Sequence, residues 1–197
     1  MSSGSVHFLR YQEYKERNMP RETIYLRDKA GQTLVKGTWR YARGYVPGEP
    51  NEGLIEQTDG SPARLADYDD SSWAVCEDLA ERNSHGFSFM WYRIRITLPE
   101  EVNGHPVSGT RVQFETCIDD YGEIWIDGEC NRDRGAIQGF NVVQRVLLSD
   151  NPSPGDQHTI ALLAANGPLA APGGTVFCRY ANLGFEWTGT ESRPNGP

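Results

Sequence analysis

The sequence contains no long hydrophobic run and has a deficit of positive charge. No stretch approaches the roughly 20 apolar residues that a membrane-spanning helix needs. Its 19 Lys and Arg residues stand against 27 Asp and Glu residues, which gives a formal net charge of −8. Such a chain offers little to neutralise a phosphate backbone. We therefore expect neither a membrane nor a nucleic-acid partner.

The motifs of several enzyme classes are also missing. The chain has no G-x-S-x-G nucleophile elbow, no P-loop and no dinucleotide fingerprint. Its four histidines show no H-E-x-x-H or related spacing, so a catalytic zinc ion is not expected. No cofactor is certain from the sequence.

The cysteines form no recognisable motif. Cys76, Cys117, Cys130 and Cys178 are widely spaced and include no C-x-x-C pair, which argues against a thiolate zinc site or a redox motif. The first eleven residues lack the apolar segment of a secretory signal. We therefore expect a cytoplasmic protein with four reduced thiols. Two disulfide bridges are the alternative, if a signal peptide once preceded this sequence.

Short apolar alternation, broken by Gly, Pro, Asn and Asp, runs through most of the chain. In the segment from Trp91 to Leu98, even-numbered residues are apolar and share one face of a strand, while Arg93 and Arg95 lie on the other face. Further strands are predicted at residues 110–116, 121–127, 141–148, 158–165 and 175–186. This pattern predicts an all-β fold, an antiparallel β-sandwich.

The 197 residues suit one domain with short additions. We expect an N-terminal extension over residues 1–32, the β-sandwich domain over residues 33–187 and a mobile tail over residues 188–197. A span rich in Gly, Pro, Asp and Glu, from Tyr45 to Asp70, is predicted to be a long loop.

Three segments carry a family resemblance when they are taken in order. They are Asp69 to Trp73 (DDSSW), Gly86 to Pro99 (GFSFMWYRIRITLP) and Gly109 to Gly128 (GTRVQFETCIDDYGEIWIDG). Together they resemble the galactose-binding-like jelly roll, in the form of the sugar-binding domain of family 2 glycoside hydrolases. The resemblance runs from about Trp39 to Glu186 and implies a jelly-roll fold. It carries over no hydrolase activity, because the catalytic glutamates of that family lie in a separate barrel domain.

Polar and aromatic residues fall on the outward side of the predicted strands under one alternation. If these strands are neighbours, the residues form a charged face with aromatic rings. Such a face suits a sugar, because a ring covers its apolar side and guanidinium groups donate hydrogen bonds to its hydroxyls. A solvated face with cross-strand ion pairs is the alternative. The candidate ligand-binding residues on this face are Trp125, Tyr121, Arg93, Arg95 and Arg179. Trp39 and Tyr45 flank the long loop and are predicted to lie at the rim of a ligand cleft, with a loop that plugs one end of the sandwich as the alternative. Arg132 and Arg134 are candidates in the loop after the predicted hairpin.

Two groups of carboxylates are further candidates. Asp119, Asp120 and Glu115 could supply the acid and base of an enzyme, whereas turn formation and sugar binding are the alternatives for the Asp pair. A possible structural calcium ion is implied by the resemblance, since some relatives use similar acidic oxygens. Its candidate ligands are Asp67, Asp69, Asp70 and Glu186.

Three hypotheses for function follow. The leading one is a jelly-roll module that binds a carbohydrate or glycoside, or another polar small molecule, by aromatic stacking and by hydrogen bonds from Arg and Asp. The second is a small stand-alone enzyme, namely a lyase, isomerase or hydrolase, that acts on a glycoside-like substrate. The third is an accessory subunit that docks on a catalytic barrel partner.

Overall fold

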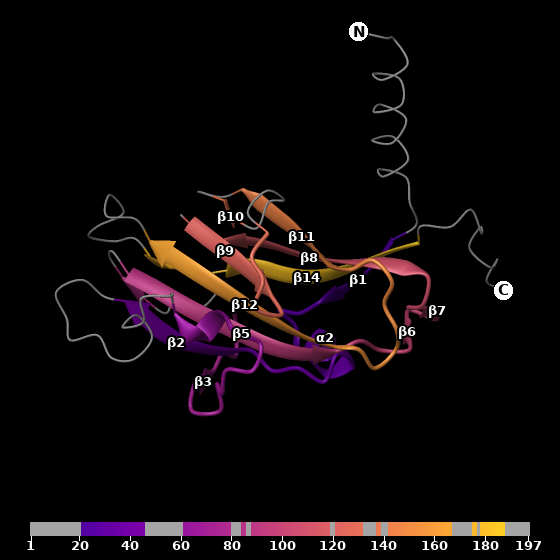
Figure 1. Cartoon of the computed structure of the whole chain (residues 1–197), viewed down its shortest axis with the longest axis horizontal. Helices are drawn as coiled ribbons and strands as arrows, with labels where there is room; N and C mark the ends of the chain where they lie inside the picture. The colour runs from indigo at the N-terminus through magenta and orange to yellow at the C-terminus, as the bar shows by residue number, and fades with distance from the viewer. Residues whose placement is uncertain are drawn as a thin grey trace, which may run out of the picture.

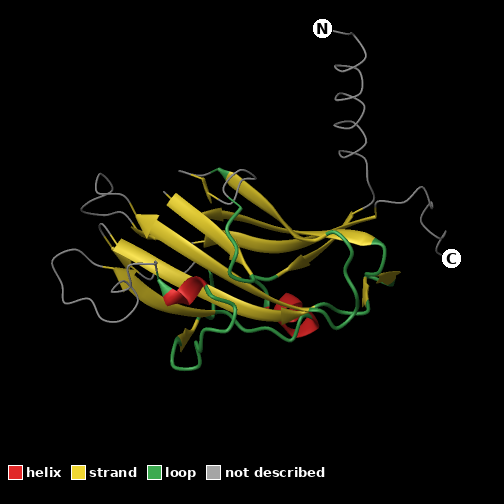
Figure 2. Ribbon diagram, viewed as in Figure 1, coloured by secondary structure: helices red, strands yellow, loops and turns green. Residues whose placement is uncertain are grey.

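The computed structural model describes residues 21–45, 61–79, 84–85, 88–118, 121–131, 137–138, 142–166, 175–176 and 178–187. Most of these residues form two antiparallel sheets that pack face to face (Figure 1, Figure 2). The fold is the antiparallel β-sandwich of jelly-roll type that the sequence predicts. None of the helices in these ranges is long and apolar enough to span a bilayer.

Each sheet mixes strands from distant parts of the chain. Sheet A contains, in order, β1 (Arg21–Tyr25), β14 (Cys178–Trp187), β8 (Thr110–Ile118) and β11 (Val143–Ser149). Sheet B contains, in order, β10 (Ile137–Gln138), β9 (Tyr121–Ile126), β12 (Gln157–Asn166), β5 (Ser88–Thr97), β2 (Arg40–Tyr45) and β3 (Ala74–Val75). Short strands pair as β4 (Ser84–His85) with β13 (Thr175–Val176) and as β6 (Glu101–Val102) with β7 (His105–Pro106). The helices within the described residues are α2 (Lys29–Leu34) and the 3-10 turn η1 (Pro62–Arg64).

The predicted strands are confirmed, but the predicted start of the domain is wrong. β1 pairs with β14 along its whole length, and Ile24 and Leu26 are buried in the core. The domain therefore includes residues that were assigned to an N-terminal extension. The apolar alternation does not predict this strand, because Arg21–Tyr25 holds a single aliphatic residue. The predicted tail over residues 188–197 lies outside the described residues.

The core lies between the sheets and follows the predicted alternation. On β5, Tyr92, Ile94 and Ile96 are at most 2% exposed, and Phe114 of β8 meets them from sheet A. Burying each such side chain contributes about 1.5–3 kcal/mol.

Trp39 also belongs to this core, which corrects its predicted place at the rim of a ligand cleft. Its side chain is 0% exposed, and its indole N–H donates to the carbonyl oxygen of Leu26 at 3.0 Å. A buried indole needs such a partner for its polar edge. Trp39 therefore ties the start of sheet B to the segment after β1.

All four cysteines are unlinked, so this structure contains no disulfide bridge. Three of them are buried, and Cys130 is half-buried. Burial raises the pKa of the Cys178 thiol, and the neighbouring Cys76 and Cys117 add to this shift. Cys178 is therefore held as a neutral thiol and acts as a core residue.

Residues 61–73, here called the covering segment, lie on the outer face of sheet B and bury Arg93 completely. The Arg93 Nε donates to Asp70 Oδ2 at 2.9 Å. Its terminal nitrogens donate to the carbonyl oxygens of Ala63, Leu65 and Tyr68. The prediction that Arg93 stands on an open face is therefore wrong, because its donors hold the covering segment on the sheet.

Replacing Arg93 by Met should lower the free energy of unfolding by about 3–5 kcal/mol, as expected for a broken buried ion pair. The substitution leaves the Asp70 carboxylate and the carbonyl oxygens of Ala63 and Leu65 without this donor, whereas the Tyr68 carbonyl keeps its hydrogen bond from Arg95. Urea denaturation followed by tryptophan fluorescence measures the loss.

The control variant is Arg27→Met, which removes a guanidinium group from an exposed pair with Asp78. Exposed ion pairs contribute little, so this variant should unfold almost as the parent protein does. Equal midpoints for the two variants would show that Arg93 does not anchor the covering segment.

Candidate functional site

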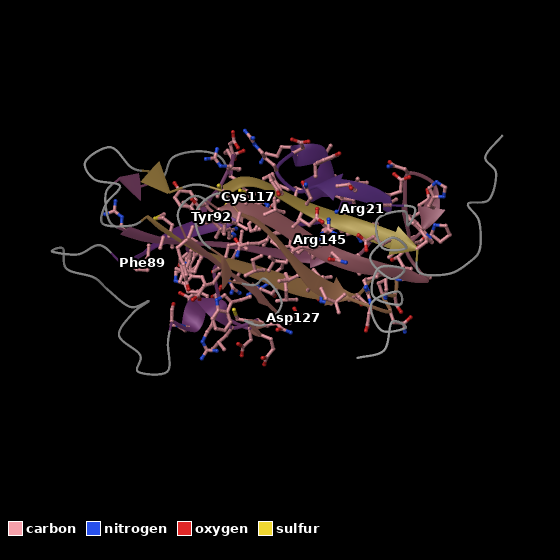
Figure 3. All side chains as sticks on the ribbon, turned by 90° about the horizontal axis from the view of Figure 1, so that it is seen from above. Arg21, Phe89, Tyr92, Cys117, Asp127 and Arg145 are labelled. Carbon is pink, nitrogen blue, oxygen red and sulfur yellow. The ribbon has the colours of Figure 1, made fainter. Side chains whose placement is uncertain are left out.

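The residues predicted to share one charged face lie on two opposite faces. β5 and β9 belong to sheet B, whereas β8 and β14 belong to sheet A. Arg95 and Trp125 are therefore separated by the whole sandwich from Glu115 and Arg179. Figure 3 shows the same division, with Arg21 and Arg145 over the strands of sheet A and Asp127 away from them. Alternation separates inward from outward side chains, but it does not say which sheet a strand joins.

On sheet B, three outward residues of β9 form a hydrogen-bonded cluster, the Tyr121–Glu123–Trp125 cluster. The phenol of Tyr121 donates to Glu123 Oε1 at 2.6 Å. The indole N–H of Trp125 donates to Glu123 Oε2 at 3.0 Å. All three side chains are half-buried. One carboxylate therefore holds two aromatic rings from alternate positions of a single strand.

The neighbours of this cluster are small or apolar on one side and cationic on another. In the register of β12, Tyr121 lies opposite Ala165 and Trp125 lies opposite Ala161. The guanidinium of Arg64, from η1 in the covering segment, lies 5.6 Å from the centre of the Trp125 ring. A cation at this distance attracts the π-electrons of the ring. The cluster thus lies beside the covering segment, at its border.

Other predicted ligand-binding residues lie apart from this cluster. Arg95 is exposed on β5, two strands away from β9, and donates to the carbonyl oxygen of Tyr68. Arg179 is exposed on β14 of sheet A. Tyr45 ends β2, and its side chain is not among those the structure describes. Four further candidates lie outside the described residues, namely Asp119, Asp120, Arg132 and Arg134.

Glu115 is a partner in ion pairs on sheet A. Its Oε2 lies 2.6 Å from Arg21 Nη2, and its Oε1 pairs with Arg145. Gly184 makes this arrangement possible, because a Cβ at that position would lie 2.2 Å from the Arg21 guanidinium. Both oxygens of Glu115 are thus engaged by cations, and the side chain is 7% exposed. This geometry supports a structural role and argues against the predicted acid–base role.

The four residues predicted as calcium ligands do not come together. Asp70 is paired with Arg93, whereas Glu186 lies on sheet A beside Gln113 and Arg145. Asp69 is exposed and accepts from the backbone N–H of Ser71, and this hydrogen bond lowers its pKa. Across the described ranges, no three His, Cys, Asp or Glu side chains gather as a metal site. The predicted set is therefore wrong as a group.

Two carboxylates on the sheet B side, those of Glu123 and Asp127, were not among the predicted site residues. Glu123 lies on the outward face that the alternation predicts. It accepts from both Tyr121 and Trp125 because it lies two residues from each of them on the same strand. Asp127 follows β9 with φ +52° and accepts from the backbone N–H of Thr159 and from His158 Nδ1, both at 2.7 Å. The Asp-Gly turn signalled a hairpin, but the sequence does not show that its carboxylate reaches β12.

Comparisons with known proteins show the fold. No protein-family model matches the chain, and no curated protein sequence matches it. Among solved structures, it is similar to Bacteroides uniformis β-glucuronidase 2 covalently bound to cyclophellitol-6-carboxylate aziridine, with a TM-score of 0.55 and 16% identity over 84% of this chain. It is also similar to a family 2 glycosyl hydrolase from Bacteroides cellulosilyticus, with a TM-score of 0.54 and 14% identity over 83% of this chain.

The chain spans 18% and 20% of the lengths of these two solved chains. It therefore shares the fold of one part of a larger enzyme. The predicted resemblance to family 2 glycoside hydrolases is confirmed at the level of the β-sandwich fold.

Replacing Glu115 by Gln should lower the free energy of unfolding by about 1–3 kcal/mol, the usual loss when a charged hydrogen-bonding partner is removed. The reason is that Arg21 and Arg145 would share a neutral amide where they now share a carboxylate. Urea denaturation measures the change, and Glu77→Gln is the control because Glu77 pairs with Lys29 on the exposed surface. An E115Q variant as stable as E77Q would contradict the structural role.

Proposed function

We propose that this protein is a carbohydrate-binding module whose ligand contacts the Tyr121–Glu123–Trp125 cluster on sheet B. The observation that carries the proposal is the double hydrogen bond by which Glu123 fixes both aromatic side chains. The β-sandwich fold shared with family 2 glycoside hydrolases is consistent with a role in carbohydrate recognition. Fold alone does not decide function, so the argument rests on the cluster.

The two rings offer what the apolar side of a sugar needs. A sugar ring carries C–H groups on its faces and hydroxyls around its edge, so it packs on aromatic surface while its edge stays polar. Tyr121 and Trp125 are four residues apart on one strand, so their Cα atoms lie about 13 Å apart. The polar edges of both rings converge on the single carboxylate of Glu123, so the rings form one continuous surface, which we expect to contact an oligosaccharide. Both rings are already held in place, which reduces the entropy that binding must remove.

Glu123 supplies the polar half of the recognition. Its two oxygens carry about four acceptor positions, of which the phenol and the indole occupy two. The remaining positions can accept hydrogen bonds from sugar hydroxyls. A neutral oligosaccharide fits this surface, because an acidic ligand would meet the carboxylate and the net charge of −8.

Binding fits the cluster better than catalysis does. A general acid or base must exchange a proton with its substrate during the reaction. Both oxygens of Glu123 hold the rings, and Glu115, the one predicted acid–base residue that lies within the described residues, is ion-paired on the opposite sheet. The enzyme hypothesis therefore receives no support from the described residues.

Replacing Trp125 by Ala should weaken oligosaccharide binding by about tenfold or more, since aromatic residues at the centre of a contact surface contribute most of the affinity. The probes are soluble neutral cello-, xylo-, manno- and galacto-oligosaccharides, tested by isothermal titration calorimetry. The parent protein should bind at least one series saturably and leave it unhydrolysed.

Two further variants make this experiment decisive. Glu123→Gln keeps the size of the side chain and should also weaken binding, because an amide replaces one acceptor oxygen by a donor. Tyr25→Ala is the control, since it removes an exposed ring from sheet A. The proposal fails if the parent protein binds none of the four series, or if W125A and E123Q bind as tightly as Y25A.

A further inference from the structure

Sheet B also contains a groove of about 500 Å³, located where β5 ends and β12 begins. The groove is bordered by the turn after β9 and by Lys36, which lies two residues after the end of α2. It is lined by Lys36, Ala66, Arg95, Ile96, Thr97, Asp127, Gln157, His158 and Thr159. Eight of these residues come from segments that the sheet pairing or backbone hydrogen bonds place side by side, so the groove is a feature of the folded domain.

The floor of the groove is polar. β5 and β12 pair with Thr97 opposite Gln157 and with Arg95 opposite Thr159. These four residues alternate with the core residues Ile96 and Ile160, so they face the outer side of the sheet. A floor of this kind presents a guanidinium, an amide and hydroxyls where neighbouring positions of sheet B carry aromatic and aliphatic residues.

The two sides of the groove are fixed by hydrogen bonds. Asp127 is held by its hydrogen bonds to Thr159 and His158. On the other side, Lys36 has a left-handed backbone with φ +53°, and the preceding Val35 accepts from the N–H of Thr97 at 2.8 Å. Lys36 is therefore held at the end of β5, although its side chain is exposed.

Several hydrogen-bonding groups in the groove have no partner among the residues that the structure describes. They are the ammonium of Lys36, the hydroxyl of Thr97 and the amide of Gln157. Arg95 donates one hydrogen bond to the carbonyl oxygen of Tyr68, and its guanidinium has further N–H donors. Asp69 is a nearby counter-charge. The Asp127 carboxylate already accepts two hydrogen bonds. Donors therefore outnumber acceptors, and two cations, Lys36 and Arg95, line this space against the single carboxylate of Asp127.

We propose that this groove binds a small hydroxylated molecule with one anionic group, namely a sugar that carries a carboxylate or a phosphate. Lys36 and Arg95 receive the anionic group, because ammonium and guanidinium donors form their strongest hydrogen bonds with carboxylate and phosphate oxygens. Thr97 and Gln157 receive the hydroxyls, since each both donates and accepts. The inference does not rest on the proposed function, which concerns a neutral ligand and other residues.

The test is a titration of the ¹⁵N-labelled protein with D-glucuronate, D-glucose 6-phosphate and D-glucose, followed by NMR in a phosphate-free buffer. At least one of the two anionic sugars should bind saturably and shift the backbone amides of Thr97, Gln157 and Thr159. The anionic sugar that binds more tightly identifies the preferred group, and neutral glucose should bind more weakly than either.

The variant Lys36→Asn should weaken binding of the anionic sugar by about tenfold, the size expected when one charge-assisted hydrogen bond is lost. Asn tolerates the left-handed backbone at this position, so the turn is kept. Gln157→Ala, at an exposed position, is a second variant and should weaken binding without changing the charge. Lys29→Gln is the control, because it removes an exposed lysine that pairs with Glu77 outside the groove.

Four outcomes would overturn the proposal. They are the absence of binding by both anionic sugars, equal binding of glucose, shifted amides away from the groove, and an equal loss of affinity in K29Q and K36N. The last outcome would mean that overall charge, and not the position of Lys36, attracts the anion. Failure of oligosaccharide binding at the Tyr121–Glu123–Trp125 cluster would leave all four criteria unaffected.

Discussion

The pairing of Arg93 with Asp70 determines which part of sheet B can meet a ligand. Arg93 has no exposed surface, and its donors reach Asp70 and three carbonyl oxygens of the covering segment. A buried guanidinium without these acceptors would be strongly unfavourable, so the covering segment and the sheet must fold together. The second apolar cluster, with Trp73 and Trp91, forms beneath the same segment. The aromatic cluster and the groove both lie next to residues of that segment.

Glu115 and Glu123 both occupy outward positions, and the residues around each one determine which groups its carboxylate binds. Glu115 on β8 lies opposite Arg145 of β11, and the small Gly184 nearby lets Arg21 reach it. Glu123 on β9 lies opposite Leu163 of β12 and accepts from the residues two positions away on its own strand. Cations surround the first carboxylate, whereas aromatic donors surround the second. The first therefore stabilises a sheet, and the second is available to a ligand.

The alternation of apolar residues was enough to predict most strands and the core, because a period of two is a local property of the chain. Ile94 and Phe114 are buried as this pattern requires. The assignment of β5 and β8 to different sheets depends on contacts between distant parts of the chain. The local alternation therefore could not show that the predicted charged face is divided between two sheets. The same limit explains Arg93, whose outward position was predicted correctly and whose cover comes from residues more than 20 positions away in the sequence.

The turn after β9 connects the two candidate sites of sheet B. Asp127 adopts a left-handed backbone that Asn and Gly adopt equally well, so turn geometry alone does not require a carboxylate there. Asp differs from Gly by having acceptor oxygens, and both of them are used on β12. These bonds fix the end of β9, two residues beyond Trp125, against the strand that forms the floor of the groove. Because each oxygen of this carboxylate already accepts a hydrogen bond from β12, Lys36 and Arg95 are the groups that would donate to an anionic ligand in the groove.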